Sequence, residues 1–277
     1  MIEPRAVALG AFDGVHLGHC RVIDAAKAEG LPTTVMTFDP HPRIALGHQV
    51  ELLTTLDRRI ELLSELGVET VVVRFTQDLA LATPEQFADL ILKPLGAKVV
   101  VAGENFRFGR SRSGDLDTLA QLGFETRPVP LLDEISSSRI RQVLREGNVE
   151  EAARLLGRAH EVEGTVVSGD ARGGTLGYPT ANLAVPAEVI VPAHGIYAGQ
   201  VGENRAAVSI GVNPHYGGQE RRIEAFLLDF DGNLYGEHLF VELWKRLRDE
   251  RAFASEQELI DQIGRDVEQT RRAEPPV

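Results

Sequence analysis

The ten residues from Gly10 to His19, Gly-Ala-Phe-Asp-Gly-Val-His-Leu-Gly-His, directly follow an apolar run at 7–9. If that run is a strand, the glycines allow a tight turn into a helix, whose free N–H groups then point at a bound group. Phosphate is the usual ligand of such a helix start. His16 and His19 are three residues apart and would share one helix face, adding donors or positive charge. The stretch therefore predicts chemistry on a nucleotide phosphate.

A second segment, Ile-Ser-Ser-Ser-Arg-Ile-Arg at 135–141, also has the composition of a phosphate site. Serines at a helix start are capping residues first. Two arginines in a first turn oppose the helix dipole unless an anion binds there too. This conflict favours a second anion site.

The first half of the chain, to about residue 130, alternates β-branched runs with helical patterns, which is typical of a parallel sheet with crossover helices. In such sheets ligands bind beyond the carboxyl ends of the strands. The segments 10–19, 39–42 and 103–109 would all lie there. The expected strands are 33–38, 70–75, 99–101 and 125–129, and the expected helices are 56–66, one from Thr83, 116–122, one from 135 and 149–157.

The second half contains strands and turns without intervening helices, so we expect a small antiparallel β-barrel or sandwich. A final helix begins at Ser255 and should pack on the barrel through one apolar stripe. We place the domain boundary so that the domains are 1–157 and 158–277. The expected strands are 162–167, 196–201, 205–211, 223–230 and 239–243, and the stripe is Leu259, Ile260, Ile263 and Val267.

Composition narrows the class of protein. A length of 277 residues suggests two domains, and a net charge of −12 argues against a nucleic-acid surface. The single cysteine, Cys20, cannot form an intrachain disulfide and is interpreted as a small packing residue. The first residues lack a signal-peptide pattern and no run approaches a membrane span, so we expect a cytoplasmic protein without a membrane partner. Oligomeric state is not predicted.

The Gly10–His19 stretch resembles the G-x-F-D-G-V-H-x-G-H signature of the bacterial bifunctional riboflavin kinase and FAD synthetase family. The resemblance continues in order along essentially the whole chain and implies a nucleotidyltransferase-type, Rossmann-like domain followed by a riboflavin-kinase barrel with a C-terminal helix. Further similar elements are the flavin-binding loop at 103–109, the I-S-S-T/S-x-I-R element at 135–141, the P-T-A-N motif at 179–182, the strand with the catalytic glutamate at 224–236, and 247–253.

For the first domain the resemblance implies adenylyl transfer, in which the phosphate of FMN attacks the α-phosphate of ATP and pyrophosphate leaves. A phosphate monoester is mostly dianionic near pH 7, so no strong base is needed and catalysis is positioning and charge neutralisation. His16 and His19 would hold the phosphates, and two ligands are too few to favour a zinc site instead. The implied contacts to ATP are Gly10, Phe12, Gly18, Ser137, Ser138 and Arg141, and those to flavin are Asn105, Phe106 and Arg107.

For the second domain the resemblance implies transfer of the γ-phosphate of ATP to the 5′-hydroxyl of riboflavin. An alcohol must lose its proton, which assigns Glu224 as general base. Thr180 and Asn182 offer oxygen atoms to Mg²⁺. The glycine-rich segment 168–177 lacks the ending of a P-loop and is interpreted as a different phosphate cradle. The implied phosphate contacts are Gly169, Arg172, Gly177 and Asn182.

Several positions depart from the family pattern, mostly in the kinase half. Gly174 replaces an arginine, His215 a threonine and Phe226 a histidine, and the segment 130–134 is short. We expect altered nucleotide affinity with kinase activity retained. Two alternatives remain open: an FMN adenylyltransferase whose barrel only binds flavin, and a non-enzymatic flavin-binding or storage protein.

Overall fold

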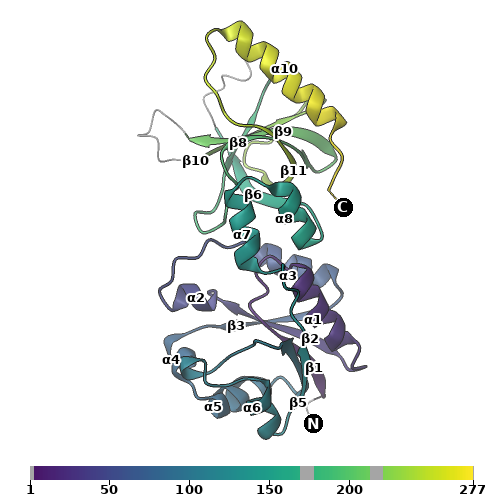
Figure 1. Ribbon diagram of the computed structural model, residues 1–277, viewed down its shortest axis with the longest axis vertical. Helices are drawn as coiled ribbons and strands as arrows, with labels where there is room; N and C mark the ends of the chain where they lie inside the picture. Colours follow the sequence, from purple (N-terminus) through teal and green to yellow (C-terminus); the bar gives the residue numbers. More distant parts are fainter. Residues whose placement is uncertain (1–2, 169–177, 213–220, 277) are drawn as a thin grey trace. The chain divides into compact units, whose positions relative to one another are not determined.

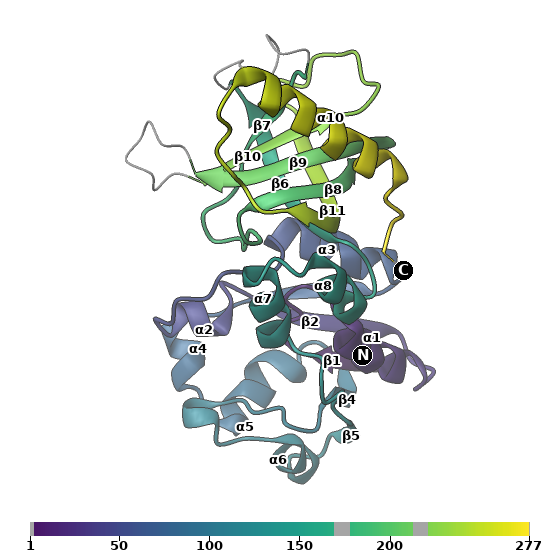
Figure 2. The same ribbon diagram turned by 45° about the horizontal axis from the view of Figure 1, so that its top comes forward.

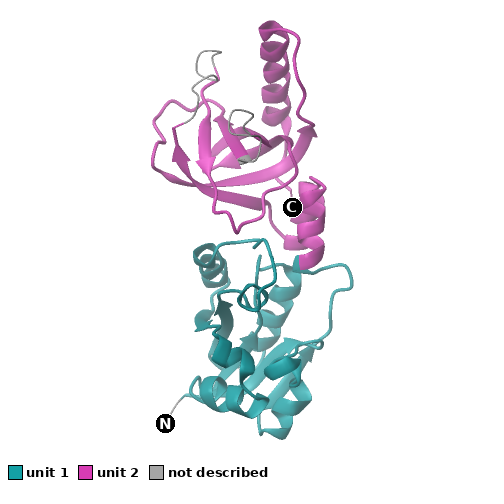
Figure 3. Cartoon of the chain, turned by 90° about the vertical axis from the view of Figure 1, so that its left-hand side faces the viewer, with its two compact units in different colours: residues 1–137 teal, residues 138–277 magenta. Residues whose placement is uncertain are grey.

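The computed structural model describes residues 3–168, 178–212 and 221–276. The chain forms two compact units, Met1–Ser137 and Ser138–Val277 (Figure 3). Helices α7 (Ser137–Arg145) and α8 (Val149–Leu156) therefore belong, apart from Ser137, to the second unit. The division into domains 1–157 and 158–277 stays a prediction.

The first unit is built on a five-stranded parallel sheet in the order β3-β2-β1-β4-β5, which confirms the predicted α/β class (Figure 1). Every strand expected in this half is present. The strands are β1 (Arg5–Leu9), β2 (Thr33–Asp39), β3 (Glu69–Arg74), β4 (Ala97–Gly103) and β5 (Glu125–Val129). The helices are α1 (Leu17–Lys27), α2 (Pro42–Ala45), α3 (Leu56–Glu65), α4 (Gln77–Leu81), α5 (Pro84–Phe87), η1 (Ala88–Leu92), η2 (Arg110–Arg112) and α6 (Leu116–Gln121).

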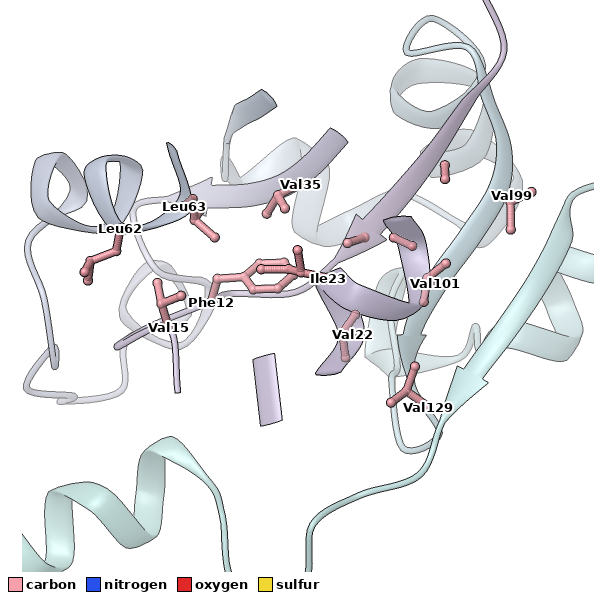
Figure 4. Packing of buried hydrophobic residues seen from close by; sticks show 13 residues of the cluster. Phe12, Val15, Val22, Ile23, Val35, Leu62, Leu63, Val99, Val101 and Val129 are labelled. Atoms are coloured by element: carbon pink, nitrogen blue, oxygen red, sulfur yellow. The ribbon is translucent and has the colours of Figure 1, made fainter. Parts of the chain in front are cut away.

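Alternation along β1 sorts its side chains between two cores, because successive residues of a strand point to opposite faces. Ala6 and Ala8 join the core under α1 and α3, together with Ile23, Leu63 and Phe12 (Figure 4). Val7 and Leu9 join the core on the other face, which is covered by α5, η1 and α6. The sheet is therefore the middle of three layers.

The predicted helix ends agree with the structure at two places. The Thr83 hydroxyl accepts from the Gln86 N–H, and the Gln86 side chain accepts from the Thr83 N–H, so α5 begins with a capping box. Gly67 follows α3 with φ +70°, the left-handed conformation that glycine adopts without a Cβ clash.

The second unit contains a closed six-stranded barrel in the order β10-β7-β6-β11-β8-β9, which selects the barrel over the sandwich. Strand β7 was not predicted, and β10 stops three residues before the predicted strand end because Asp229 turns the chain with φ +56°. The strands are β6 (His160–Val167), β7 (Ala181–Ala184), β8 (Gly195–Val201), β9 (Asn204–Val212), β10 (Arg221–Leu227) and β11 (His238–Arg248).

Helix α10 (Glu256–Arg272) packs on β8 and β9, as expected (Figure 2). The expected apolar stripe is only half-buried, and the most buried positions are Gln262, Asp266 and Thr270. The reason is a polar seam: Arg248 of β11 donates to both oxygens of Asp266, and the Gln262 amide donates to the same carboxylate. Satisfied polar groups thus replace apolar contacts along this helix.

His160 lies buried at the start of β6, and its Nε2 has no hydrogen-bond partner among the described residues. Burial, with a smaller contribution from Arg158, lowers the pKa of His160 to about 3. The unfolded chain, in which histidine titrates near 6.5, binds more protons between these two values. Stability from the neutral imidazole is therefore complete above about pH 6.5 and is lost as the pH falls toward 3.

We expect acidification from pH 7.5 to 5 to cost the barrel about 2 kcal/mol of unfolding free energy through His160. His160→Gln should flatten this dependence, whereas His194→Gln, at an exposed position, should not. The measurement is urea unfolding followed by the fluorescence of Trp244, the single tryptophan of the chain. Equal pH dependence in wild type and His160→Gln would contradict the assignment.

Candidate active sites

The loop after β1 runs from Gly10 to the first turn of α1 through an unusual backbone. Phe12 has φ +49° and Val15 φ +39°, a region that non-glycine residues rarely occupy. Gly10 is anchored by its N–H, which donates to the Met36 carbonyl of β2 at 3.3 Å. Such strain persists only where the surrounding structure enforces it, and it gathers at functional sites.

His16 and His19 lie together at the start of α1. Their rings are stacked, with centroids 3.6 Å apart, and the ring of Phe12 lies 5.1 Å from that of His19. Gly18 permits this arrangement, because a Cβ there would come within 3.1 Å of the His16 ring. The structure therefore brings the predicted histidine pair together.

Reciprocal hydrogen bonds determine which nitrogen of each imidazole ring carries the proton. The His16 Nδ1 accepts from the His19 N–H, and the His19 Nδ1 accepts from the His16 N–H, each at 3.3 Å. An accepting Nδ1 carries no proton, so the proton of each neutral ring is on Nε2. Both rings are thereby set up as Nε2–H donors beside a helix N-terminus.

Two further elements hold this loop in place. The buried carboxylate of Asp13 accepts from the Leu53 N–H at 2.9 Å, and the Gly14 N–H donates to the Thr54 hydroxyl at 3.3 Å. The Ser137 hydroxyl donates to the Asp13 carbonyl at 3.1 Å. Of the predicted phosphate contacts, Ser137 thus touches the loop directly.

Ser138 and Arg141 follow on the first turns of α7, which belong to the second unit. Arg141 is buried and Ser138 is exposed. Their predicted role in phosphate binding rests on the sequence.

The predicted flavin loop follows β4, which pairs with β1 in parallel, so both loops leave the same edge of the sheet. Asn105 and Arg107 are exposed, and Arg107 donates to the Phe106 carbonyl. The half-buried Phe106 ring lies nearly parallel to Phe108, with centroids 5.7 Å apart. The loop thus offers an aromatic surface with polar neighbours.

Sequence reasoning missed Arg59, whose guanidinium is buried at this same edge. Its Nη1 lies within hydrogen-bonding distance of the Ala11 carbonyl, at 3.1 Å, and the Thr37 hydroxyl, at 3.1 Å. A signal was present: Arg59 lies three residues after Leu56 and four before Leu63, on the apolar face of the helix.

In the barrel, Thr180, Asn182 and Glu224 lie together. Glu224 of β10 is directly opposite Asn182 of β7, and the Thr180 hydroxyl donates to Glu224 Oε1 at 3.3 Å. Arg222 lies on the same face of β10 and pairs with that oxygen at 2.7 Å. The predicted base thus has a hydroxyl, an amide and a cation as neighbours.

The remaining kinase predictions are placed only in part. Gly169, Arg172 and Gly177, and the departures at Gly174 and His215, lie outside the described residues. Phe226 meets Tyr178 edge to face, with ring centroids 5.3 Å apart.

The described ranges contain no group of three or more His, Cys, Asp or Glu that could hold a metal ion. Hydroxyl, amide and carboxylate oxygens at Thr180, Asn182 and Glu224 nonetheless fit Mg²⁺, which prefers oxygen and takes most of its remaining ligands from water and substrate phosphates.

Family models match both parts of the chain: a model described as FAD synthetase covers residues 2–141, and one described as riboflavin kinase covers 156–274. These matches define the class of protein: an enzyme with two parts, each of which belongs to a different transferase family.

Curated relatives span the whole length. The bifunctional riboflavin kinase/FMN adenylyltransferase of Listeria monocytogenes is 39% identical, over 96% of this chain and 91% of the relative. That of Escherichia coli is 38% identical, over 95% and 91%. The chain belongs to the family of bifunctional riboflavin kinase/FMN adenylyltransferases.

A crystal structure from Streptococcus pneumoniae shares the fold, with a TM-score of 0.89 and 36% identity over 98% of this chain and 95% of the other. That protein is described as a macrolide-efflux protein. Within the described part of the present chain, no helix has the length and hydrophobicity needed to cross a membrane.

Gly14→Ala should disturb the loop after β1, which leads to His16 and His19, more than backbone strain alone would. Gly14 has φ +82°, and a Cβ there would lie 2.6 Å from the Leu53 side chain. Gly67→Ala is the matched control, since its φ is +70° with open space around it. We expect a loss of about 1 kcal/mol of unfolding free energy for Gly67→Ala and more for Gly14→Ala. Chemical denaturation measures both, and equal losses would contradict the close packing of Leu53.

Proposed function

We propose that this chain phosphorylates riboflavin to FMN at the Thr180, Asn182 and Glu224 cluster and adenylylates FMN to FAD at the loop from Gly10 to His19. Each reaction consumes one ATP, and the proposed domains are 1–157 for adenylyl transfer and 158–277 for the kinase. The observation that carries the adenylyl-transfer half is the stacked His16 and His19 pair at the start of α1, in which each Nδ1 accepts a backbone N–H. The kinase half rests on the contact of Thr180 with Glu224 and the pairing of Glu224 with Asn182.

In the proposed adenylyl transfer, a phosphate oxygen of FMN attacks the α-phosphorus of ATP as the bond to pyrophosphate breaks. The Nε2–H groups of His16 and His19 stabilise the charge that develops on the phosphate oxygens. The nucleophile is already ionised, so neither histidine must accept a proton. The residues proposed to bind ATP are Gly10, Phe12, Gly18, Ser137, Ser138 and Arg141, and those proposed to bind flavin are Asn105, Phe106 and Arg107.

In the proposed kinase reaction, Glu224 accepts the proton of the riboflavin 5′-hydroxyl. The 5′-oxygen of riboflavin attacks the γ-phosphorus of ATP, and ADP leaves. Thr180 and Arg222 both contact Glu224 Oε1 and so fix the orientation of this carboxylate. Bound Mg²⁺ would neutralise phosphate charge. We propose Thr180 and Asn182 as its protein contacts, with Asn182, Gly169, Arg172 and Gly177 at the phosphates.

The proposed partners are the small molecules riboflavin, FMN and ATP, with no nucleic acid or membrane. We propose a cytoplasmic location because both reactions draw on ATP. The net charge of −12 supports the absence of a nucleic-acid surface.

A single experiment tests the proposal against its alternatives. Purified protein is incubated with Mg-ATP and either riboflavin or FMN, and the flavins are separated by chromatography. We expect FMN and then FAD in the first tube and FAD in the second. FAD from FMN without FMN from riboflavin would leave only the adenylyltransferase, and unchanged flavin in both tubes would leave a flavin-binding protein.

His19→Ala should lower kcat for FAD formation from FMN by about 100-fold, because one donor to the transition-state charge is lost. KM for ATP should change by less than about threefold, since the ground state loses little. His48→Ala, at an exposed position of the same unit, is the control. Initial rates with varied ATP give both constants, and an unchanged kcat would refute the role of His19.

Glu224→Gln should lower the rate of FMN formation by about 100-fold or more, while FAD formation from supplied FMN continues. The amide keeps the shape of the side chain but cannot accept the proton. Glu188→Gln, in an exposed part of the same unit, should leave both rates unchanged. Loss of both activities in folded Glu224→Gln protein would overturn the assignment of separate sites.

A further inference from the structure

Arg59 carries a buried positive charge at the edge of the sheet where the loop after β1 begins. The residue is 1% exposed, and its Nη1 reaches the Ala11 carbonyl, the Thr37 hydroxyl and the Phe38 carbonyl, at 3.1, 3.1 and 3.2 Å. One side chain thus links the loop after β1 to the end of β2.

Burial of the Arg59 guanidinium has a desolvation cost. Burial lowers the pKa of Arg59, and the charges of Asp13 and Asp39 oppose that shift, so the guanidinium stays charged. Its Nε is buried with no hydrogen-bond partner among the described residues. An apolar side chain on this face of α3 would avoid the desolvation cost of a buried charge.

The position of Arg59 points to the loop as the object of its contacts. The segment 53–59 contacts three residues of that loop: Leu53 contacts Asp13, Thr54 contacts Gly14, and Arg59 contacts Ala11. The residue after Ala11 is Phe12, whose ring lies against His19. A shift of the Ala11 carbonyl would therefore reach the histidine pair through a single residue.

We propose that Arg59 is a positioning residue for adenylyl transfer. It fixes the Ala11 carbonyl and the end of β2, and so holds the His19 ring, which lies against Phe12, where its Nε2–H group meets the reacting phosphate. Its action on the reaction passes through His19. The inference rests on the adenylyl transfer proposed above.

Three variants separate the charge from the geometry. Arg59→Met removes both, Arg59→Lys keeps the charge but loses the planar fork, and Thr37→Val removes the second donor to the Ala11 carbonyl. Arg58→Met is the matched control, since Arg58 is on the same helix and pairs with Glu61 and Glu65 of that helix.

We expect kcat for FAD formation from FMN to fall about 100-fold in Arg59→Met and about 10-fold in Arg59→Lys and Thr37→Val, because misplacement of about 1 Å costs rates of this order. KM for ATP should change by less than about threefold. Circular dichroism on the same preparations, below the unfolding midpoint, reports whether the first unit is folded, and FMN formation from riboflavin should stay unchanged.

A double-mutant cycle gives the deciding measurement. If Arg59 acts through His19, adding Arg59→Met to His19→Ala should lower kcat by less than about threefold further. A merely structural residue would lower kcat by the same factor in both backgrounds, and that result, or a wild-type kcat in Arg59→Met, would overturn the inference. Should Arg59→Met fail to fold, Arg59→Lys and Thr37→Val enter the same cycle. Wild type that makes no FAD would instead refute the proposed function itself.

Discussion

The parallel pairing of β1 with β2 and β4 is the constraint on which the first unit depends. Parallel strands end at one edge, so the loops after β1 and β4 and the end of β2 must share it. Backbone groups at this edge need partners: the Thr54 hydroxyl accepts from the Gly14 N–H, and Arg59 donates to the Ala11 and Phe38 carbonyls. The stacked histidines follow from this anchoring, because the strained turn at Phe12 and Val15 is held from several sides.

The two proposed reactions place different demands on the protein. A phosphate nucleophile arrives ionised, and the loop after β1 offers donors for charge: helix N–H groups and two Nε2–H groups. An alcohol must be deprotonated, and the barrel offers a carboxylate, Glu224, opposite an amide on the neighbouring strand. The protonation state of the nucleophile thus accounts for the difference between the two candidate sites: hydrogen-bond donors in the loop after β1, and a carboxylate base in the barrel.

Local patterns could be predicted from the sequence, whereas contacts between residues far apart along the chain could not. The apolar run at 7–9 and the Thr83 cap are local, so β1 and α5 agree with prediction. The strands and turns of the second half fit a barrel or a sandwich, and only closure distinguishes them. Arg59 was missed because a charged residue on an apolar face is normally assigned to solvent. The seam of α10 was missed because burial was equated with apolarity, and Asp266 is buried through its pairing with Arg248.

Helix α10 is joined to the barrel by directional bonds, and these bonds reach the strands that carry or neighbour Glu224. Arg271, in its last turn, pairs with Asp229 just beyond the end of β10, and Arg205 of β9 donates to the carbonyls of Thr270 and Ala273. An apolar stripe could rotate or slide, whereas these bonds allow one register. The last turn of α10 therefore stabilises the end of β10, the strand that carries Glu224.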